Sequence, residues 1–229
     1  MAQHTRDWDA RFRAGDTPWE DDVVPPSVVE LVSEYAPPRS TVLEIGCGRG
    51  ATAVWLAERG YRVVACDISP EAVRQARQRA ESAAVEVRFL VADMLANRPQ
   101  LPAVDVVFTR GVLHTFISDV GRHRFATAVA DCVPDGGLWL DISGNADTPD
   151  APGDRARHGL PRLTLSDIAS AVESCFEVLS VRRVMYGSEP GRTDFLGWAS
   201  AFRRRTDRNP VAEAAASSAQ HPPPPTEFE

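Results

Sequence analysis

The chain has 229 residues, of which 43% are apolar and 25% charged, as is typical of a globular protein with one buried core. No apolar run approaches the 18 residues of a membrane span, and the polar start MAQHTRDWDARFRAGD does not resemble a secretory signal, so we expect a cytoplasmic protein with no membrane partner. The formal net charge of −7 argues against nucleic acid as a partner, because phosphate contacts require a basic surface. The chain contains no lysine, which excludes Schiff-base catalysis by a lysine amine.

The four cysteines are Cys47, Cys66, Cys132 and Cys175. They form no C-x-x-C pair, and no histidine follows them at the spacing of metal ligands. We therefore expect reduced thiols and no metal site.

The two ends of the chain differ from its middle. Residues 1–26 hold three aromatic side chains but little periodicity, so we expect an irregular arm, followed by a short helix from about Ser27 to Tyr35. Residues 206–229 are rich in Ala, Ser and Pro and are expected to be disordered. These boundaries leave residues 27–205 as the main domain.

Strand and helix patterns alternate through that domain. Strands are expected at 40–45, 61–67, 85–93, 104–110, 137–143, 176–186 and 195–205. Helices are expected at 51–60, at 69–81, where Ser69 caps and Pro70 follows, at 121–133 and at 164–175. This alternation predicts an α/β fold with a mostly parallel sheet of seven strands. The last two strands have no helix between them, so they should pair as an antiparallel hairpin.

The stretch VLEIGCGRG (42–50) joins the first strand to the first helix of this pattern. Such a glycine-rich turn allows backbone N–H groups and the helix N-terminus to face a ligand. The dinucleotide fingerprint is G-x-G-x-x-G, whereas the spacing here is G-x-G-x-G, with Glu44 two residues ahead of the first glycine. A carboxylate at that point would repel a pyrophosphate but would suit a cationic ligand.

Acidic side chains also end the next two strands. Asp67 ends the second, where a carboxylate accepts both hydroxyls of a ribose, and Asp93 ends the third, near the position of an adenine. A cationic adenosine without phosphates is S-adenosylmethionine (SAM). The segments VLEIGCGRG, VVACDIS, VADM and VVFTRGVLHTF, in this order, resemble the successive motifs of class I SAM-dependent methyltransferases. The resemblance is close over roughly residues 41–143 and extends to the later strands by pattern.

The resemblance implies the fold of that class, a Rossmann-like, doubly wound sheet of seven strands with one antiparallel strand, and SAM as the cofactor. It also implies a role for each matching residue. Gly46, Cys47, Gly48 and Gly50 form the turn along which the methionine part of SAM lies, with Glu44 towards its amino group.

By the same resemblance, Asp67 binds the ribose and Ile68 packs on the adenine. Asp93 accepts a hydrogen bond from the adenine amino group, and Met94 lies beside the ring. Arg110, with Gly111 next to it, lies at the mouth from which the methyl group leaves. Each acid has a plainer interpretation as a helix cap or a solvated strand end.

The segment RDWDARFRAGDTPWEDD (6–22) resembles the N-terminal arm of small-molecule methyltransferases, including the thiopurine S-methyltransferase and tellurite-resistance groups. In those groups the arm folds over the cofactor and closes the pocket. The resemblance implies that Trp19 lies near the sulfonium, where a cation–π contact is favourable, and that Trp8 and Phe12 line the substrate pocket. The alternative is that these rings only pack the arm onto the sheet.

His114, in GVLHTF, is the candidate catalytic residue, because an imidazole can act as a general base at neutral pH. It can equally line the pocket without taking a proton, since a thiolate acceptor needs no base. Thr115 and Phe116 are further pocket candidates. Arg110 is expected to form a salt bridge with Glu44 rather than with a substrate carboxylate.

We expect the basic residues 122–124, near the start of a helix, to lie on its solvent-exposed face and to have no role in the site.

The leading hypothesis is an enzyme that moves a methyl group from SAM to an S, O or N atom of a small molecule. The alternative is a SAM-binding protein that transfers no methyl group, and a third class is an NAD-dependent oxidoreductase. Titration with SAM and NAD separates the third class from the first two.

Overall fold

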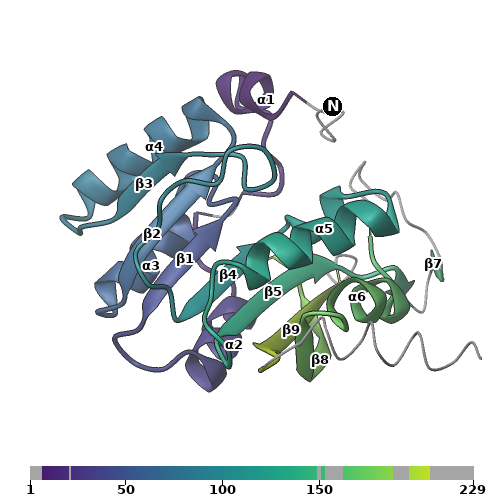
Figure 1. Cartoon of the computed structure of the whole chain (residues 1–229). Coiled ribbons are helices and arrows are strands. Elements are labelled where there is room, and N and C mark those ends of the chain that lie inside the picture. Colours follow the sequence, from purple (N-terminus) through teal and green to yellow (C-terminus); the bar gives the residue numbers. More distant parts are fainter. Residues whose placement is uncertain (1–6, 21, 149–150, 153–161, 188–195, 207–229) are drawn as a thin grey trace, which may run out of the picture.

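The computed structural model describes residues 7–20, 22–148, 151–152, 162–187 and 196–206 (Figure 1). From residue 207 onward the expected disordered tail lies outside the described residues, as do residues 1–6 of the arm. The division into arm, domain and tail therefore stays a prediction.

A seven-stranded sheet forms the centre of the molecule (Figure 1). Its strands are β1 (Thr41–Ile45), β2 (Arg62–Asp67), β3 (Arg88–Val91), β4 (Val106–Arg110), β5 (Leu138–Gly144), β8 (Phe176–Met185) and β9 (Leu196–Arg204). Their order is β3-β2-β1-β4-β5-β9-β8. β9 runs antiparallel to both of its neighbours, and the other pairs are parallel. The predicted fold class, including the hairpin of the last two strands, is confirmed.

Helices cover both faces of this sheet. α2 (Pro26–Tyr35), α3 (Ala51–Glu58) and α4 (Pro70–Ser82) contribute Leu31, Leu56 and Val73 to the core on one face. α5 (Asp119–Ala130) and α6 (Leu165–Val172) contribute Val129 and Ile168 to the core on the other. The short 3₁₀ helix η1 (Leu113–Thr115) follows β4, and β6 (Asp147–Thr148) pairs with β7 (Ala151–Pro152) outside the main sheet. Among the described residues no helix is both long and apolar enough to span a bilayer.

The described part of the arm contains a helix that the periodicity did not predict. α1 spans Trp8–Ala14; the carboxylate of Asp7 caps its first turn, and Gly15 ends it with a φ of 68°. The expectation of an irregular arm is therefore wrong over these residues.

α1 lies beside α4 (Figure 1) and is attached to the N-terminus of that helix. An oxygen of Asp9 accepts hydrogen bonds from the hydroxyl of Ser69 (2.7 Å) and the backbone N–H of Glu71 (2.9 Å). The side chain of Phe12 is buried. These contacts hold the arm over the end of the sheet.

The basic run at the start of α5 is only partly solvated. His123 and Arg124 are exposed as expected, but Arg122 is buried. Its guanidinium donates to the carbonyl oxygen of Phe116 (2.9 Å) and to a carboxylate oxygen of Asp167 (3.1 Å). The expectation was wrong for Arg122, which connects the loop after η1 to α6.

The sheet topology fixes where a ligand site can form. β1 lies between β2 and β4, so the chain leaves β1 in one direction and later returns on its other side. In open α/β sheets ligands bind at this switch point, beyond the carboxyl ends of the strands. The carboxyl end of β1 is the glycine turn.

Candidate active site

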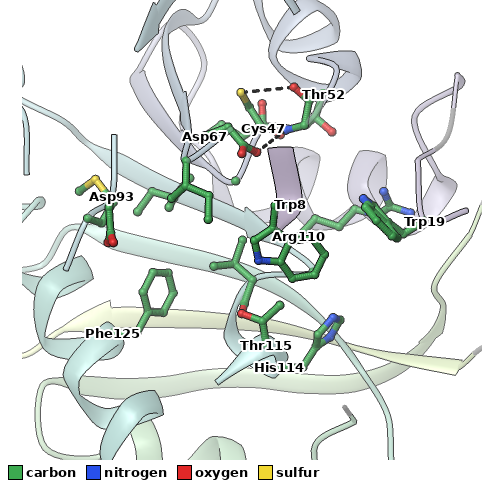
Figure 2. A pocket seen from close by; sticks show the side chains of 18 of the residues that line it. Trp8, Trp19, Cys47, Thr52, Asp67, Asp93, Arg110, His114, Thr115 and Phe125 are labelled. Atoms are coloured by element: carbon green, nitrogen blue, oxygen red, sulfur yellow. Dashed lines mark hydrogen bonds between the residues drawn. The ribbon is translucent and has the colours of Figure 1, made fainter. Parts of the chain in front are cut away.

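A cavity of about 1110 Å³, its open mouth included, lies at the carboxyl ends of the parallel strands (Figure 2). Its lining comes from the arm, from the loops after β1 to β4, from α5 and from the end of β8. In Figure 2, Asp67 and Asp93 lie towards one end of the drawn side chains, and Thr115 and His114 towards the other. Ligands of open α/β sheets bind at this edge, so this cavity is the candidate site.

The cavity brings together the predicted site residues with one exception. Those that line it are Trp8, Phe12, Trp19, Glu44, Gly46, Cys47, Gly48, Asp67, Ile68, Asp93, Met94, Arg110, His114, Thr115 and Phe116. Gly50 does not line it. A Cβ on Gly50, whose φ is 77°, would lie 2.8 Å from the Cβ of Ala76, so this glycine allows α3 to approach α4.

The surroundings of Gly48 explain why this position of the turn carries no side chain. Its φ is 51°, and a Cβ there would overlap the carboxylate of Glu20 from the arm. The backbone N–H of Gly48 donates to an oxygen of Asp67 (3.0 Å). Gly48 therefore lies close to two carboxyl groups, that of Glu20 from the arm and that of Asp67 from β2.

Asp67 is buried with both carboxylate oxygens in hydrogen bonds. One accepts the N–H of Gly48 and the other the N–H of Ser69 (2.9 Å). Burial raises the pKa of Asp67 to about 6, although these N–H groups lower it. A carboxylate has about four lone-pair sites, so each oxygen retains capacity for a ligand hydroxyl.

Glu44 is the most perturbed acid in the cavity. The side chain is 4% exposed, and burial raises its pKa to about 8; the charges of Glu20 and Asp67 act in the same direction, whereas Arg110 lowers it. Among the described residues its Oε2 has no hydrogen-bond partner. This buried oxygen can therefore accept a hydrogen bond from a ligand, and a cationic donor would favour the ionised form of Glu44.

Glu20 is a site residue that the sequence analysis missed. Its side chain is 12% exposed, and its Oε2 accepts the backbone N–H of Arg49 (3.1 Å) in the glycine turn before α3. Burial raises the pKa of Glu20, and Arg49 lowers it. The signal in the sequence was an acid directly after Trp19.

The adenine candidates occupy the loops after β2 and β3. Asp93 lines the cavity and also caps its own turn, because its Oδ1 accepts the N–H groups of Leu95 (2.9 Å) and Ala96 (3.3 Å). Met94 is buried beside it, and Ile68 lines the same cavity. The structural and the ligand-binding interpretations of Asp93 are therefore compatible.

Arg110 makes contacts that differ from the expected salt bridge. Its guanidinium lies 4.8 Å from the ring centre of Tyr186 and donates to the backbone oxygen of the same residue (3.2 Å). Its charge still lowers the pKa of Glu44. Tyr186 follows β8, 76 residues from Arg110, and no sequence signal pointed to it.

His114 is buried, with 1% of its surface exposed. Its Nδ1 accepts the backbone N–H of Gly144 (2.8 Å), so the neutral ring carries its proton on Nε2. A ring held this way is a hydrogen-bond donor at Nε2, which does not suit the role of a general base. The hydroxyl of Thr115 donates to the carbonyl of Val112 (2.7 Å), and the ring of Phe116 stacks on that of Phe125.

The arm aromatics pack on one another at the cavity. Trp19 meets Trp8 and Phe12 edge to face, with ring centres 5.5 Å and 6.2 Å apart. The guanidinium of Arg11 lies 4.2 Å from the ring centre of Trp19. All three rings line the cavity, so packing of the arm and lining of the site occur together.

Comparison with known proteins supports the class that the motifs predicted. Residues 42–137 match the family model described as a methyltransferase domain. Over 87 residues the chain is 34% identical to a tRNA 5-carboxymethoxyuridine methyltransferase of Escherichia coli (strain K12), an alignment covering 36% of this chain and 33% of that protein.

Two solved structures share the fold over nearly the whole chain. A protein described in a study of the conversion of a disulfide bond into a thioacetal group during echinomycin biosynthesis has a TM-score of 0.71 and 25% identity, covering 93% of this chain and 98% of that one. The 1,6-didemethyltoxoflavin-N1-methyltransferase of Burkholderia thailandensis, solved with 1,6-didemethyltoxoflavin and S-adenosylhomocysteine (SAH), has a TM-score of 0.68 and 19% identity, covering 87% and 86%.

The chain spans about a third of the length of the first curated relatives that it matches. The predicted resemblance to class I SAM-dependent methyltransferases is confirmed, by the family model for residues 42–137 and by the fold for the sheet as a whole.

Proposed function

We propose that this protein is a SAM-dependent methyltransferase that transfers the methyl group of SAM to a nucleophilic S, O or N atom of a small molecule by in-line displacement. The observation that carries the proposal is a group of three carboxyl side chains that line the cavity. Glu20, Glu44 and Asp67 all have raised pKa values there, and an oxygen of Glu44 has no partner among the described residues. Such a lining favours a cationic nucleoside over one that carries phosphates.

The residues present suit this cofactor. In the proposed complex the two oxygens of Asp67 accept the ribose hydroxyls, and the unpartnered Oε2 of Glu44 accepts from the ammonium group of the methionine part. The absence of a side chain at Gly48 leaves room for the carboxylate of Glu20 beside the turn, where it can face the cationic cofactor. Ile68 and Met94 enclose the adenine, with Asp93 at its rim.

When bound, SAM supplies a methyl group already activated by a positively charged sulfur. The chain's own task is then to hold the acceptor in line with that methyl group and to exclude water, which supplies much of the acceleration in a bimolecular reaction. The arm serves both purposes, since Trp8, Phe12 and Trp19 wall the cavity.

A small acceptor is favoured by this closure. Asp9 fastens the arm to the start of α4, and Glu20 fastens it to Arg49 in the glycine turn. The cavity that the arm covers is lined largely by apolar and aromatic side chains. The toxoflavin methyltransferase that shares the fold was solved with a small-molecule substrate, whereas the relative from Escherichia coli is named for tRNA. The net charge of −7 favours the small molecule.

His114 has the role of a hydrogen-bond donor in this proposal. The Gly144 N–H occupies Nδ1 and leaves the proton of the neutral ring on Nε2, so the imidazole orients an acceptor oxygen or anion rather than removing a proton. A nucleophile that is already ionised, such as a thiolate, needs no base.

We place the protein in the cytoplasm as part of this proposal. All four cysteines are free thiols, as in proteins of reducing compartments.

The test is incubation of the purified protein with methyl-labelled SAM and a panel of small thiols, phenols and amines, followed by mass detection of the products. Methylation of at least one class, together with SAH release, is the expected result. Tight SAM binding without turnover on any acceptor would instead favour a SAM-binding protein that transfers no methyl group. Transfer to tRNA but to no small molecule would refute the proposed acceptor class.

A further inference from the structure

Among the described residues of the arm, Glu20 is the one acid that lines the cavity. It lies between α1 and α2, and its carboxylate occupies the space beside Gly48 that a side chain would fill. Its Oε2 accepts the N–H of Arg49 (3.1 Å) and lies 3.4 Å from the Nε of the same arginine. Closing the arm therefore carries a negative charge into the site.

That charge enters a site that already holds two buried acids, Glu44 and Asp67. After burial itself, Glu20 is the next factor that raises the pKa of Glu44, and it also raises the pKa of Asp67. Arg49 and Arg110 offset the charge of Glu20 in part. The Oε2 of Glu44 has no hydrogen-bond partner among the described residues, so the acidic end of the site has unused capacity for a cation.

The proposed reaction changes the charge at this point. The bond between the methyl carbon and the sulfonium sulfur breaks, the methyl carbon bonds to the acceptor atom, and the electron pair of the broken bond stays on sulfur. SAM carries one positive charge more than SAH. The attraction between the cofactor and Glu20 is therefore present before transfer and weaker after it.

We propose that Glu20 makes the closed arm select SAM over SAH, so that loss of the sulfonium charge favours opening of the arm and release of the product. The inference rests on the proposed function. It assigns Glu20 a specificity role in addition to its contact with Arg49 in the glycine turn. A purely structural role, as a tie between the arm and this turn, would make no distinction between the two cofactor forms.

The test compares the dissociation constants of SAM and SAH, measured by calorimetry on the full chain, for the wild type, Glu20→Gln and Asp22→Asn. Asp22 is the matched control, because it lies in the same segment and contacts the same Arg49 (3.5 Å) but is 78% exposed and does not line the cavity. Because a charge pair in a partly buried site interacts at an effective dielectric constant of about 20, Glu20→Gln is expected to weaken SAM binding about tenfold or more and SAH binding much less.

Asp22→Asn should leave the ratio of the two constants within about twofold of the wild type, as for an exposed charge. Equal loss for SAM and SAH in Glu20→Gln, or no loss for either, would overturn the inference and leave the proposed function standing. Binding of neither compound to the wild-type protein would refute the proposed function instead.

A second measurement on the wild type does not depend on the folding of a variant. Hydrogen exchange of the amides in α1 should be slower with saturating SAM than with saturating SAH. Equal protection by the two compounds would contradict the inference.

Discussion

Glu44 should make SAM binding depend on pH. Burial raises the pKa of Glu44 to about 8 in the free protein, so at pH 7 about nine-tenths of the molecules hold a proton there. A cation bound beside the carboxylate stabilises its ionised form and lowers that pKa, so binding at pH 7 releases up to about 0.9 proton. The affinity for SAM should therefore rise by up to about tenfold per pH unit between about pH 6 and pH 7.5.

Other groups that face Glu44 modify this expectation. Asp67, whose pKa is raised to about 6, adds a smaller release towards the acid end of the range. The raised pKa of Glu20 acts in the same direction, and Arg110 opposes both because its charge favours the ionised acids.

The assay is calorimetric titration with SAM at several pH values, each in two buffers of different ionisation enthalpy, which gives the number of protons released. Glu44→Gln should bind SAM more weakly and with a strongly reduced release. Glu58→Gln, which changes an exposed acid on α3, should behave as the wild type. A wild-type protein that binds SAM without proton release, or an unchanged release in Glu44→Gln, would refute the reasoning.

Three further substitutions test separate parts of the account. Asp67→Ala should weaken SAM binding by about 1–3 kcal/mol through the loss of charge-assisted hydrogen bonds, and an unchanged affinity in calorimetry would remove the ribose assignment. His114→Gln should keep turnover within about tenfold of the wild type if a donor is what the site needs, whereas a loss of about 100-fold or more in both His114→Gln and His114→Ala would restore the general base. Gly50→Ala should lower the free energy of unfolding by about 1–3 kcal/mol, because it combines a φ of 77° with a 2.8 Å approach to Ala76. Denaturant unfolding measures that loss, and a variant as stable as the wild type would contradict the packing role.

The strands and helices of the sheet domain were predictable because each is determined by residues close together in the sequence. Apolar runs such as VLEI before the glycine turn, and the cap and proline at Ser69 and Pro70, determine elements within a few residues. The doubly wound arrangement of the sheet followed from the family resemblance, whereas the order of the strands came from the structure.

The helix in the arm was missed for a physical reason. α1 has only seven residues, too few for a clear apolar period, although its caps, Asp7 and Gly15, were readable in the sequence. Its stability comes from contacts distant in sequence, such as the bond from Asp9 to the start of α4.

Contacts between residues distant in sequence were also what the prediction of the candidate site missed. The residues that follow strands were predicted, because parallel strands end at one edge of a sheet. Tyr186 and Glu20 were missed, since their approach to Arg110 and Gly48 depends on tertiary structure alone. The tautomer of His114 is likewise set by Gly144, 30 residues away.

The central claim is that the turn after β1 binds a cationic adenosine that carries no phosphates. Calorimetric titration of the purified protein with SAM and, separately, with NAD tests this claim most directly. The account predicts saturable binding of SAM at one site per chain and no measurable heat with NAD. Saturable binding of NAD together with no binding of SAM would contradict it.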